Sequence, residues 1–128
     1  MVPAHALALS RLSQVSMTAH DLERATTFYR DTLGMRHLFS VPNMAFFDCS
    51  GVRLMLGVPE AGEHDHPGSV LYFDVPDIHA AHAALVERGV RTIGEPHFVA
   101  KLADGDYWMG FFKDSEGNTL AITSMRRA

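Results

Sequence analysis

The sequence repeats one pattern of segments. VSMTAHDLERATTFYRDTLGM, which starts at Val15, and LYFDVPDIHAAHAALVERGV, which starts at Leu71, both begin with the alternation typical of a strand. Each segment then reaches an aspartate, continues with apolar residues at helical spacing, and ends at or next to a glycine. An internal repeat constrains a fold strongly, because both copies must form the same unit and the units must pack together.

The ends of the two expected helices carry matching signals. Asp21 and Asp77 are suited to cap the helices, since an aspartate side chain accepts the free backbone N–H groups of the first turn. Gly34 and Gly89 then end them, because glycine adopts the left-handed conformation without steric cost. Between these ends, apolar residues recur as in a helix buried on one side. They are Leu22, Ala25, Tyr29 and Leu33 in the first copy, and Ile78, Ala81 and Leu85 in the second.

Hairpin patterns follow in both copies. FFDCSGVRLML and FFKDSEGNTLAI each read as a strand, a turn with glycine and another strand. Two βαβββ modules therefore account for nearly the whole chain. We predict a single α+β domain of 128 residues, with modules at about 12–58 and 68–124, in which a curved mixed sheet forms a cup.

Strand alternation predicts which side chains face the cup, because successive residues point to opposite faces. In the first module, Gln14, Arg53 and Met55 are on the cup side, opposite the apolar residues of their strands. A three-residue turn in the first hairpin would add Phe47. In the second module, the same argument places Tyr72 on the cup side.

A second hairpin is expected at Asp104-Gly105, a dipeptide typical of two-residue turns. Folding the chain there pairs Leu102 with Tyr107, and the wholly apolar face that carries Tyr107 then packs beneath a helix. The opposite face, which would line the cup, carries His97, Trp108 and Phe112. Trp108 either fills the core or stacks on a ligand, and its place opposite the apolar face favours stacking on a ligand.

Composition and charge exclude several classes of protein. The chain is 47% hydrophobic and has a net charge of −4, so it lacks the positive surface that nucleic-acid binding needs. No apolar run approaches the roughly 20 residues of a membrane helix, and the first residues do not resemble a signal peptide. The single cysteine, Cys49, excludes an internal disulfide and is interpreted as a small half-buried residue. We expect a cytoplasmic protein with no nucleic-acid or membrane partner.

The ordered set of motifs resembles a known family. DLERATTFYRDTLGM, FDVPDIHAAHAALVERGV and FFKDSEGNTLAI together are similar to the vicinal oxygen chelate superfamily, which includes glyoxalase I, bleomycin-resistance proteins and extradiol dioxygenases. The resemblance covers roughly residues 12 to 124. It implies two βαβββ modules whose sheets curl into a cup that holds a small molecule, and it implies a homodimer.

The resemblance also implies where a metal would bind. Metal-using members take one ligand from each of four strands, and by position these places fall on Gln14, Met55 (or Leu56), Val70 and Ala121. A divalent ion prefers carboxylate oxygen or imidazole nitrogen, and of these residues only Gln14 offers a ligand, a weak one. We therefore expect no metal and no other cofactor, which argues against glyoxalase I and ring-cleaving dioxygenase chemistry.

The histidines allow other interpretations. His79 and His82 lie three residues apart on the second helix, and we interpret them as solvated rather than metal-binding. The segment GEHDHPG, residues 62–68, reads as a loop that could also close over the cup or bind a metal. His97 is either packed against an aromatic neighbour, or a hydrogen-bonding anchor or general acid–base for a ligand.

Two functions stay open. The sequence favours a binding module, in which a metal-free cup sequesters a small, flat or partly apolar molecule, as bleomycin-resistance relatives sequester a drug. The residues expected to contact the ligand are Gln14, Phe47, Arg53, Met55, Tyr72, His97, Trp108 and Phe112. The alternative is a metal-independent isomerase, cyclase or lyase, in which His97 acts as acid or base and Gln14 or Tyr72 holds an oxyanion.

Overall fold

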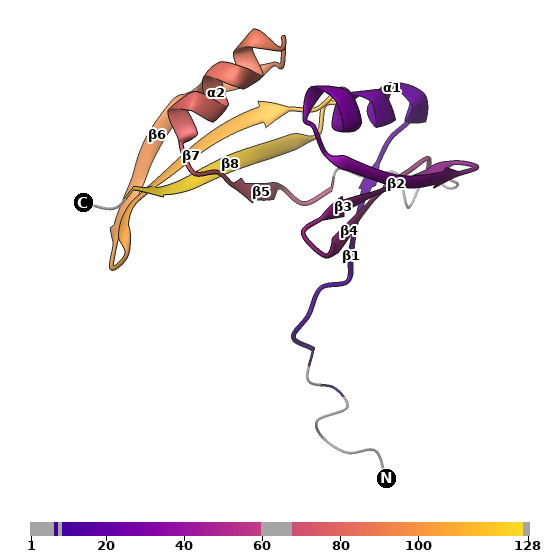
Figure 1. Ribbon diagram of the computed structural model, residues 1–128, viewed down its shortest axis with the longest axis horizontal. Helices are drawn as coiled ribbons and strands as arrows, with labels where there is room; N and C mark the ends of the chain where they lie inside the picture. The colour runs from indigo at the N-terminus through magenta and orange to yellow at the C-terminus, as the bar shows by residue number, and fades with distance from the viewer. Residues whose placement is uncertain (1–6, 8, 60–67, 127–128) are drawn as a thin grey trace.

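Two four-stranded sheets lie side by side, each with a helix on one face (Figure 1). The computed structural model describes residues 7, 9–59 and 68–126. The first module consists of β1 (Gln14–Thr18), α1 (Leu22–Thr27), the π-helical turn η2 (Phe28–Thr32), β2 (Arg36–Val41), β3 (Met44–Cys49) and β4 (Val52–Gly57). The second consists of β5 (Leu71–Asp74), α2 (Ile78–Glu87), β6 (Thr92–Leu102), β7 (Gly105–Lys113) and β8 (Thr119–Arg126).

The strand orders of the two sheets correspond. They are β1-β4-β3-β2 and β5-β8-β7-β6, and in each sheet the first strand is parallel to its neighbour while the other pairs are antiparallel. This is the βαβββ arrangement predicted from the repeat, and the fold class is confirmed. Within the described residues, no helix is both long and apolar enough to cross a membrane.

The helix ends follow the sequence signals. The side chains of Asp21 and Asp77 accept from the backbone N–H groups of Arg24 and Ala80, as N-caps should. Gly34 and Gly89 have φ of 72° and 76°. The π-helical turn was not predicted. In it the N–H of Leu33 donates to the carbonyl of Phe28, five residues earlier.

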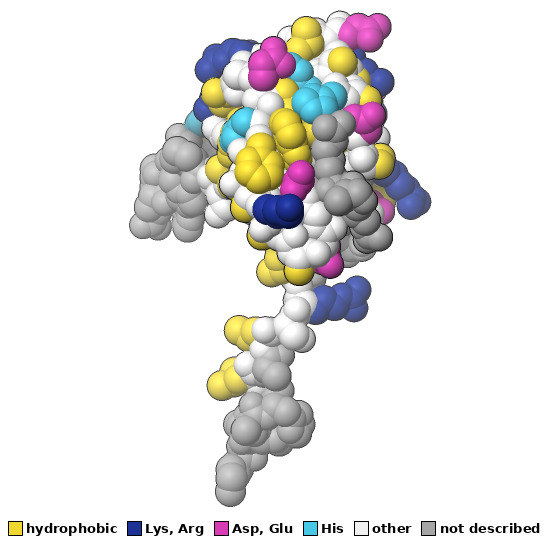
Figure 2. Space-filling model, turned by 90° about the vertical axis from the view of Figure 1, so that its left-hand side faces the viewer, with side chains coloured by type: hydrophobic (Ala, Val, Ile, Leu, Met, Phe, Trp, Pro, Cys, Tyr) yellow, Lys and Arg dark blue, Asp and Glu magenta, His cyan; other side chains and the backbone are white. Residues whose placement is uncertain are grey.

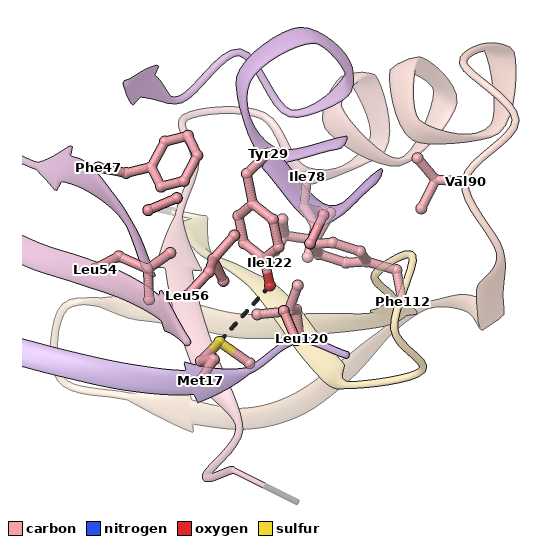
Figure 3. Close-up of a cluster of buried hydrophobic side chains, with 13 residues drawn as sticks. Met17, Tyr29, Phe47, Leu54, Leu56, Ile78, Val90, Phe112, Leu120 and Ile122 are labelled. Carbon is pink, nitrogen blue, oxygen red and sulfur yellow. Dashed lines mark hydrogen bonds between the residues drawn. The ribbon is translucent and has the colours of Figure 1, made fainter. Parts of the chain in front are cut away.

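One hydrophobic core joins the two modules. Tyr29, on η2, is fully buried between side chains of the first sheet, such as Phe47 and Leu54, and side chains of the second module, such as Ile78 of α2 and Phe112 of β7 (Figure 3). Its hydroxyl approaches the sulfur of Met17 at 3.6 Å. The helix of the first module therefore completes the interior of the second.

The turn between β7 and β8 holds the start of α1. Asp114 is 6% exposed and accepts from the Tyr29 hydroxyl at 2.6 Å and from the side chain and backbone N–H groups of Asn118. The side chain of Glu116 is 4% exposed and accepts from the backbone N–H groups of His20 and Asp21. These contacts tie the N-terminal end of the first helix to the far hairpin of the second module.

The turn of the β3–β4 hairpin decides where Phe47 points. Cys49 pairs with Val52, so the turn contains only Ser50 and Gly51, both with positive φ. A two-residue turn places Phe47 opposite Leu54, and its side chain is fully buried beneath the helix. The expected position of Phe47 on the cup side, which assumed a three-residue turn, is wrong.

The register of the β6–β7 hairpin also differs from the prediction. Leu102 pairs with Gly105 rather than with Tyr107, so the two turn residues are Ala103 and Asp104. Two irregularities interrupt β6, between Ile93 and His97 and between Phe98 and Ala100.

These shifts exchange the two faces of β7. Phe112 is 2% exposed in the core, and Trp108 packs against the same core and stacks edge-on against His79 of α2 at 5.3 Å. The expected placement of Trp108 and Phe112 on the cup side is therefore wrong.

Candidate functional site

The open face of the first sheet carries the polar residues expected there. β1 and β4 pair in parallel, with Gln14 beside Arg53 and Ser16 beside Met55. The amide nitrogen of Gln14 lies 3.8 Å from the sulfur of Met55. Leu56, the alternative to Met55, is fully buried on the other face. The predicted facing of Gln14, Arg53 and Met55 is confirmed, whereas their contact with a ligand stays a prediction.

Arg53 rests on two aromatic rings of this face. Its guanidinium carbon lies 5.7 Å from the ring centre of Phe39 and 5.4 Å from that of Phe46. The two rings are stacked on each other, with centres 4.7 Å apart. Phe39 and Phe46 were missed by the sequence reasoning. The Ser50-Gly51 turn could have identified Phe46, because it places Phe46 opposite Met55.

Two hollows indent the same face. One, of about 350 Å³, is lined by Ser13, Gln14, Leu38, Asp48, Gly51 and Arg53. The other, of about 290 Å³, lies further along β1 and β4 and is lined by residues that include Ser16, Thr18, Met44 and Met55. Both volumes lie near the lower end of the range for small-molecule sites.

The open face of the second sheet carries an aromatic group. Tyr72 on β5 contacts Phe111 on β7 edge to face, with ring centres 6.2 Å apart, above Ala121 of the intervening strand. The ring of His97, on β6, stacks on the ring of Phe111, and the two ring centres are 6.1 Å apart. The expected facing of Tyr72 and His97 is confirmed. Phe111 takes the place expected for Phe112, because β7 begins one residue earlier than its turn signal indicated.

The structure divides the expected ligand residues into three sets. The first sheet holds Gln14, Arg53 and Met55, and the second holds Tyr72 and His97. Phe47, Trp108 and Phe112 lie in or against the core. The two open faces belong to different sheets. A hollow of about 640 Å³ between the modules is lined by Tyr72, but not by Gln14, Arg53, Met55 or His97.

One of the two histidines of α2 is less solvated than expected, whereas His79 is exposed. His82 has a side chain only 13% exposed, with Nδ1 3.8 Å from a carboxylate oxygen of Glu95 on β6. Figure 2 views the side formed by α2 and β6, where histidines lie among hydrophobic side chains. Within the described residues, no group of three or more His, Cys, Asp or Glu is arranged to hold a metal ion. Of the segment 62–68, residues 62–67 lie outside the described residues.

Cys49 is half-buried at the end of β3, with its sulfur 3.4 Å from that of Met35. Burial, and then the neighbouring carboxylate of Asp48, raise the pKa of the Cys49 thiol. A raised pKa disfavours the thiolate, so Cys49 lacks the activation of a nucleophile.

Known proteins share both the sequence pattern and the fold. The family model described as "Glyoxalase/Bleomycin resistance protein/Dioxygenase superfamily" matches residues 11–122. The chain belongs to this superfamily. A "Glyoxylase-like domain-containing protein" from Didymella fabae is 28% identical over 126 residues, which cover 88% of this chain and 91% of the relative.

Solved structures of the glyoxalase superfamily have the same fold. A member from Sphaerobacter thermophilus is 25% identical, with a TM-score of 0.75 over 92% of this chain and 99% of that one. The lactoylglutathione lyase from Agrobacterium tumefaciens is 21% identical, with a TM-score of 0.71 over 90% of this chain and 93% of that one. At these identities, the likeness to the lyase concerns the fold alone.

The four places at which the family resemblance implies metal ligands carry poor donors here. Gln14 offers an amide and Met55 a thioether, whereas Val70 and Ala121 offer only alkyl groups. Ala121 is also fully buried between the strands of Tyr72 and Phe111. Divalent ions of this kind of site prefer carboxylate and imidazole ligands, so these residues do not fit such an ion.

Proposed function

We propose that this chain binds a small, partly aromatic molecule on the open faces of its sheets, without a divalent ion at the usual places. The observation that carries the proposal is the group formed by Tyr72, Phe111 and His97. Tyr72 is 51% exposed although it lies in ring contact with Phe111. Exposed rings with a polar edge suit stacking on a flat ligand and hydrogen bonding to its rim.

The first sheet supports the same proposal with polar and charged side chains rather than with aromatic rings alone. Its hollows combine the thioether of Met55 with the polar groups of Gln14 and Arg53. Both faces leave apolar side chains exposed, among them Phe39 and Tyr72, and extended exposed apolar surface marks an interface or a ligand site. We therefore propose a homodimer in which a second copy covers these faces around the ligand.

A comparison of two aromatic residues tests the proposal. Ligand-observed NMR against a panel of flat aromatic compounds identifies binders, and Tyr72→Ala should weaken them about 5- to 30-fold, because one stacked ring contributes roughly 1–2 kcal/mol. Phe98→Ala is the matched control, since Phe98 is also 51% exposed but contacts Trp108 on the side of α2. Equal effects of the two changes would contradict the assignment of the site.

Elemental analysis of the same untagged protein completes this test. We expect well under one equivalent of zinc, nickel, manganese or iron per chain. A tightly held equivalent that is lost in Gln14→Ala would overturn the metal-free part of the proposal.

A metal-independent enzyme is the second candidate, and the position of His97 favours it. His97 lies on the open face of the second sheet, as an acid or base for a bound molecule must. Its ring stacks on Phe111 and its Nδ1 lies 3.5 Å from the carbonyl of Glu95, which also matches the alternative of a histidine packed against an aromatic neighbour. His97→Gln separates the two functions once a binder is known. Unchanged compound and a loss of affinity below about tenfold support binding alone. A fall in turnover of about 10²- to 10⁴-fold at similar affinity supports general acid–base catalysis.

A further inference from the structure

We propose that Arg53 binds the carboxylate of a planar, singly charged acid on the open face of the first sheet. This inference rests on the proposed function and names the chemical class of its ligand. Three observations support it: two aromatic rings hold the guanidinium group, the opposing acid forms no ion pair with it, and the charges around it sum to a single positive charge.

The two phenylalanines hold the guanidinium group in place. Its carbon lies within 6 Å of both ring centres, and the rings are stacked 28° from parallel. A guanidinium over an aromatic face uses its flat side for that contact and keeps its N–H groups, at the rim, for hydrogen bonds. Within the described residues, the side chain of Arg53 forms no hydrogen bond and no ion pair beyond these ring contacts.

The acid opposite Arg53 in the sheet does not form an ion pair with it. Asp48 lies directly opposite Arg53 in the β3–β4 ladder, where a cross-strand ion pair would be favourable. One carboxylate oxygen of Asp48 instead accepts from the backbone N–H of Gly51 at 3.0 Å, and the Arg53 side chain extends over the rings of the next row. The structure therefore leaves a charged, preorganised donor on a face that is open to solutes.

The surrounding groups favour a carboxylate over a doubly charged anion. The hollow beside Arg53 is also lined by Asp48, and Arg36 lies opposite Asp48 on the other side. Two cations and one anion leave a single positive charge in this row, which matches a monoanion. A carboxylate also fits the guanidinium fork with two parallel hydrogen bonds, and the amide of Gln14 lines the same hollow as a further donor.

The body of the ligand is expected to be flat. Phe39 is 43% exposed beside Arg53, and Met55 lies opposite Phe46 in the neighbouring row. These groups form an apolar surface next to the charge. A planar acid can place its ring system on that surface while its carboxylate meets Arg53.

Three matched probes test this inference on the full chain: 2-naphthoate, its uncharged amide 2-naphthamide, and the doubly charged 2-naphthyl phosphate. Titrations followed by ¹H–¹⁵N NMR give both the dissociation constant and the location of the shifts. We expect naphthoate to bind about 10- to 100-fold more tightly than the amide, since charge-assisted hydrogen bonds are the stronger kind. The shifts should fall on β1, β3 and β4.

Substitutions then assign the preference to one side chain. Arg53→Gln should abolish the preference for naphthoate over the amide, and Arg53→Lys should restore part of it, because a lysine keeps the charge but loses the fork. Arg91→Gln, which removes an exposed cation between α2 and β6, should leave the preference unchanged. Spectra of the free variants establish that each is folded.

The outcomes separate this inference from the proposed function. Equal binding of naphthoate and amide, or a preference that survives in Arg53→Gln, overturns the role of Arg53 while aromatic binding stands. Tighter binding of naphthyl phosphate than of naphthoate overturns the assignment to a monoanion. Failure of all three probes to bind at millimolar concentration contradicts both the inference and the proposed aromatic ligand.

Discussion

A single buried hydroxyl on β8 has no visible role in the fold. Ser124 is 1% exposed, on the side of the second sheet that α2 covers, and its oxygen has no hydrogen-bond partner within the described residues. A buried polar group without a partner costs about 1–3 kcal/mol. We predict that Ser124→Ala raises the free energy of unfolding by about 1 kcal/mol, measured by urea denaturation.

The matched control for this change is Ser16→Ala. Ser16 is exposed on the open face of β1, so its removal should alter stability by less than about 0.5 kcal/mol. A loss of stability in Ser124→Ala, of similar size to the expected gain, would mean that the hydroxyl bonds to a buried water molecule.

Among the helices and turns, the contact between η2 and the β7–β8 turn gives a prediction with a defined pH range. Burial first, and then the charge of Asp114 and the hydrogen bond to it, hold the pKa of Tyr29 well above its usual range. A group whose pKa is raised by folding contributes stability that is complete below its unfolded pKa, about 10 for tyrosine, and that declines as the pH rises further.

Tyr29→Phe tests this dependence by difference. At pH 8 the variant should be less stable than the parent by about 1–2 kcal/mol, because the carboxylate of Asp114 loses a buried donor. Above about pH 10, the gap should narrow as the parent loses the contribution of its neutral phenol. Urea denaturation between pH 7 and 11 measures both values. A gap that stays constant or widens at high pH would contradict the burial of a neutral Tyr29.

The helix ends and the regular strands are the parts of the fold and the site that the sequence could predict. The helices were predictable because Asp21, Asp77, Gly34 and Gly89 act through local backbone geometry. Gln14, Arg53 and Met55 were placed correctly because β1 and β4 are regular, so alternation holds along their whole length. In a regular strand, the alternation of the sequence is enough to predict which face each side chain lies on.

The errors all arose at turns and bulges. The position of Phe47 depended on whether one residue more or fewer entered the β3–β4 turn, and that of Trp108 on a hairpin register interrupted twice in β6. A shift of one residue reverses every side chain beyond it. His97 kept its predicted side because the irregularities of β6 compensated for the shifted turn, which no local signal in the sequence announced.

For the whole molecule, the open faces lead to a prediction about assembly. Phe39 and Val41 are more than 40% exposed on the first sheet and Tyr72 is 51% exposed on the second. We predict that the chain sediments at micromolar concentration with twice the 14.1 kDa mass of one chain. Val41→Lys should shift the equilibrium toward the single chain, because it places a charge in the apolar interface.

Val86→Lys is the control for this substitution. Val86 is 53% exposed on α2, away from the open faces, so its replacement should not change the sedimentation. A species of one chain only, in the parent protein at micromolar concentration, would contradict the proposed assembly.

The position of Tyr29 restricts how such a chain can be rearranged. Its two halves repeat each other in sequence, yet Tyr29 of the first half is buried among residues of the second. There its hydroxyl donates a hydrogen bond to Asp114. If the second half is combined with the first half of a relative, that first half must supply a ring that fills the same space and donates the same hydrogen bond. If the first half is combined with another second half, that half must supply an acid that accepts the bond. Recombination at the seam between the halves should therefore lower the free energy of unfolding wherever the two sides of this contact do not match.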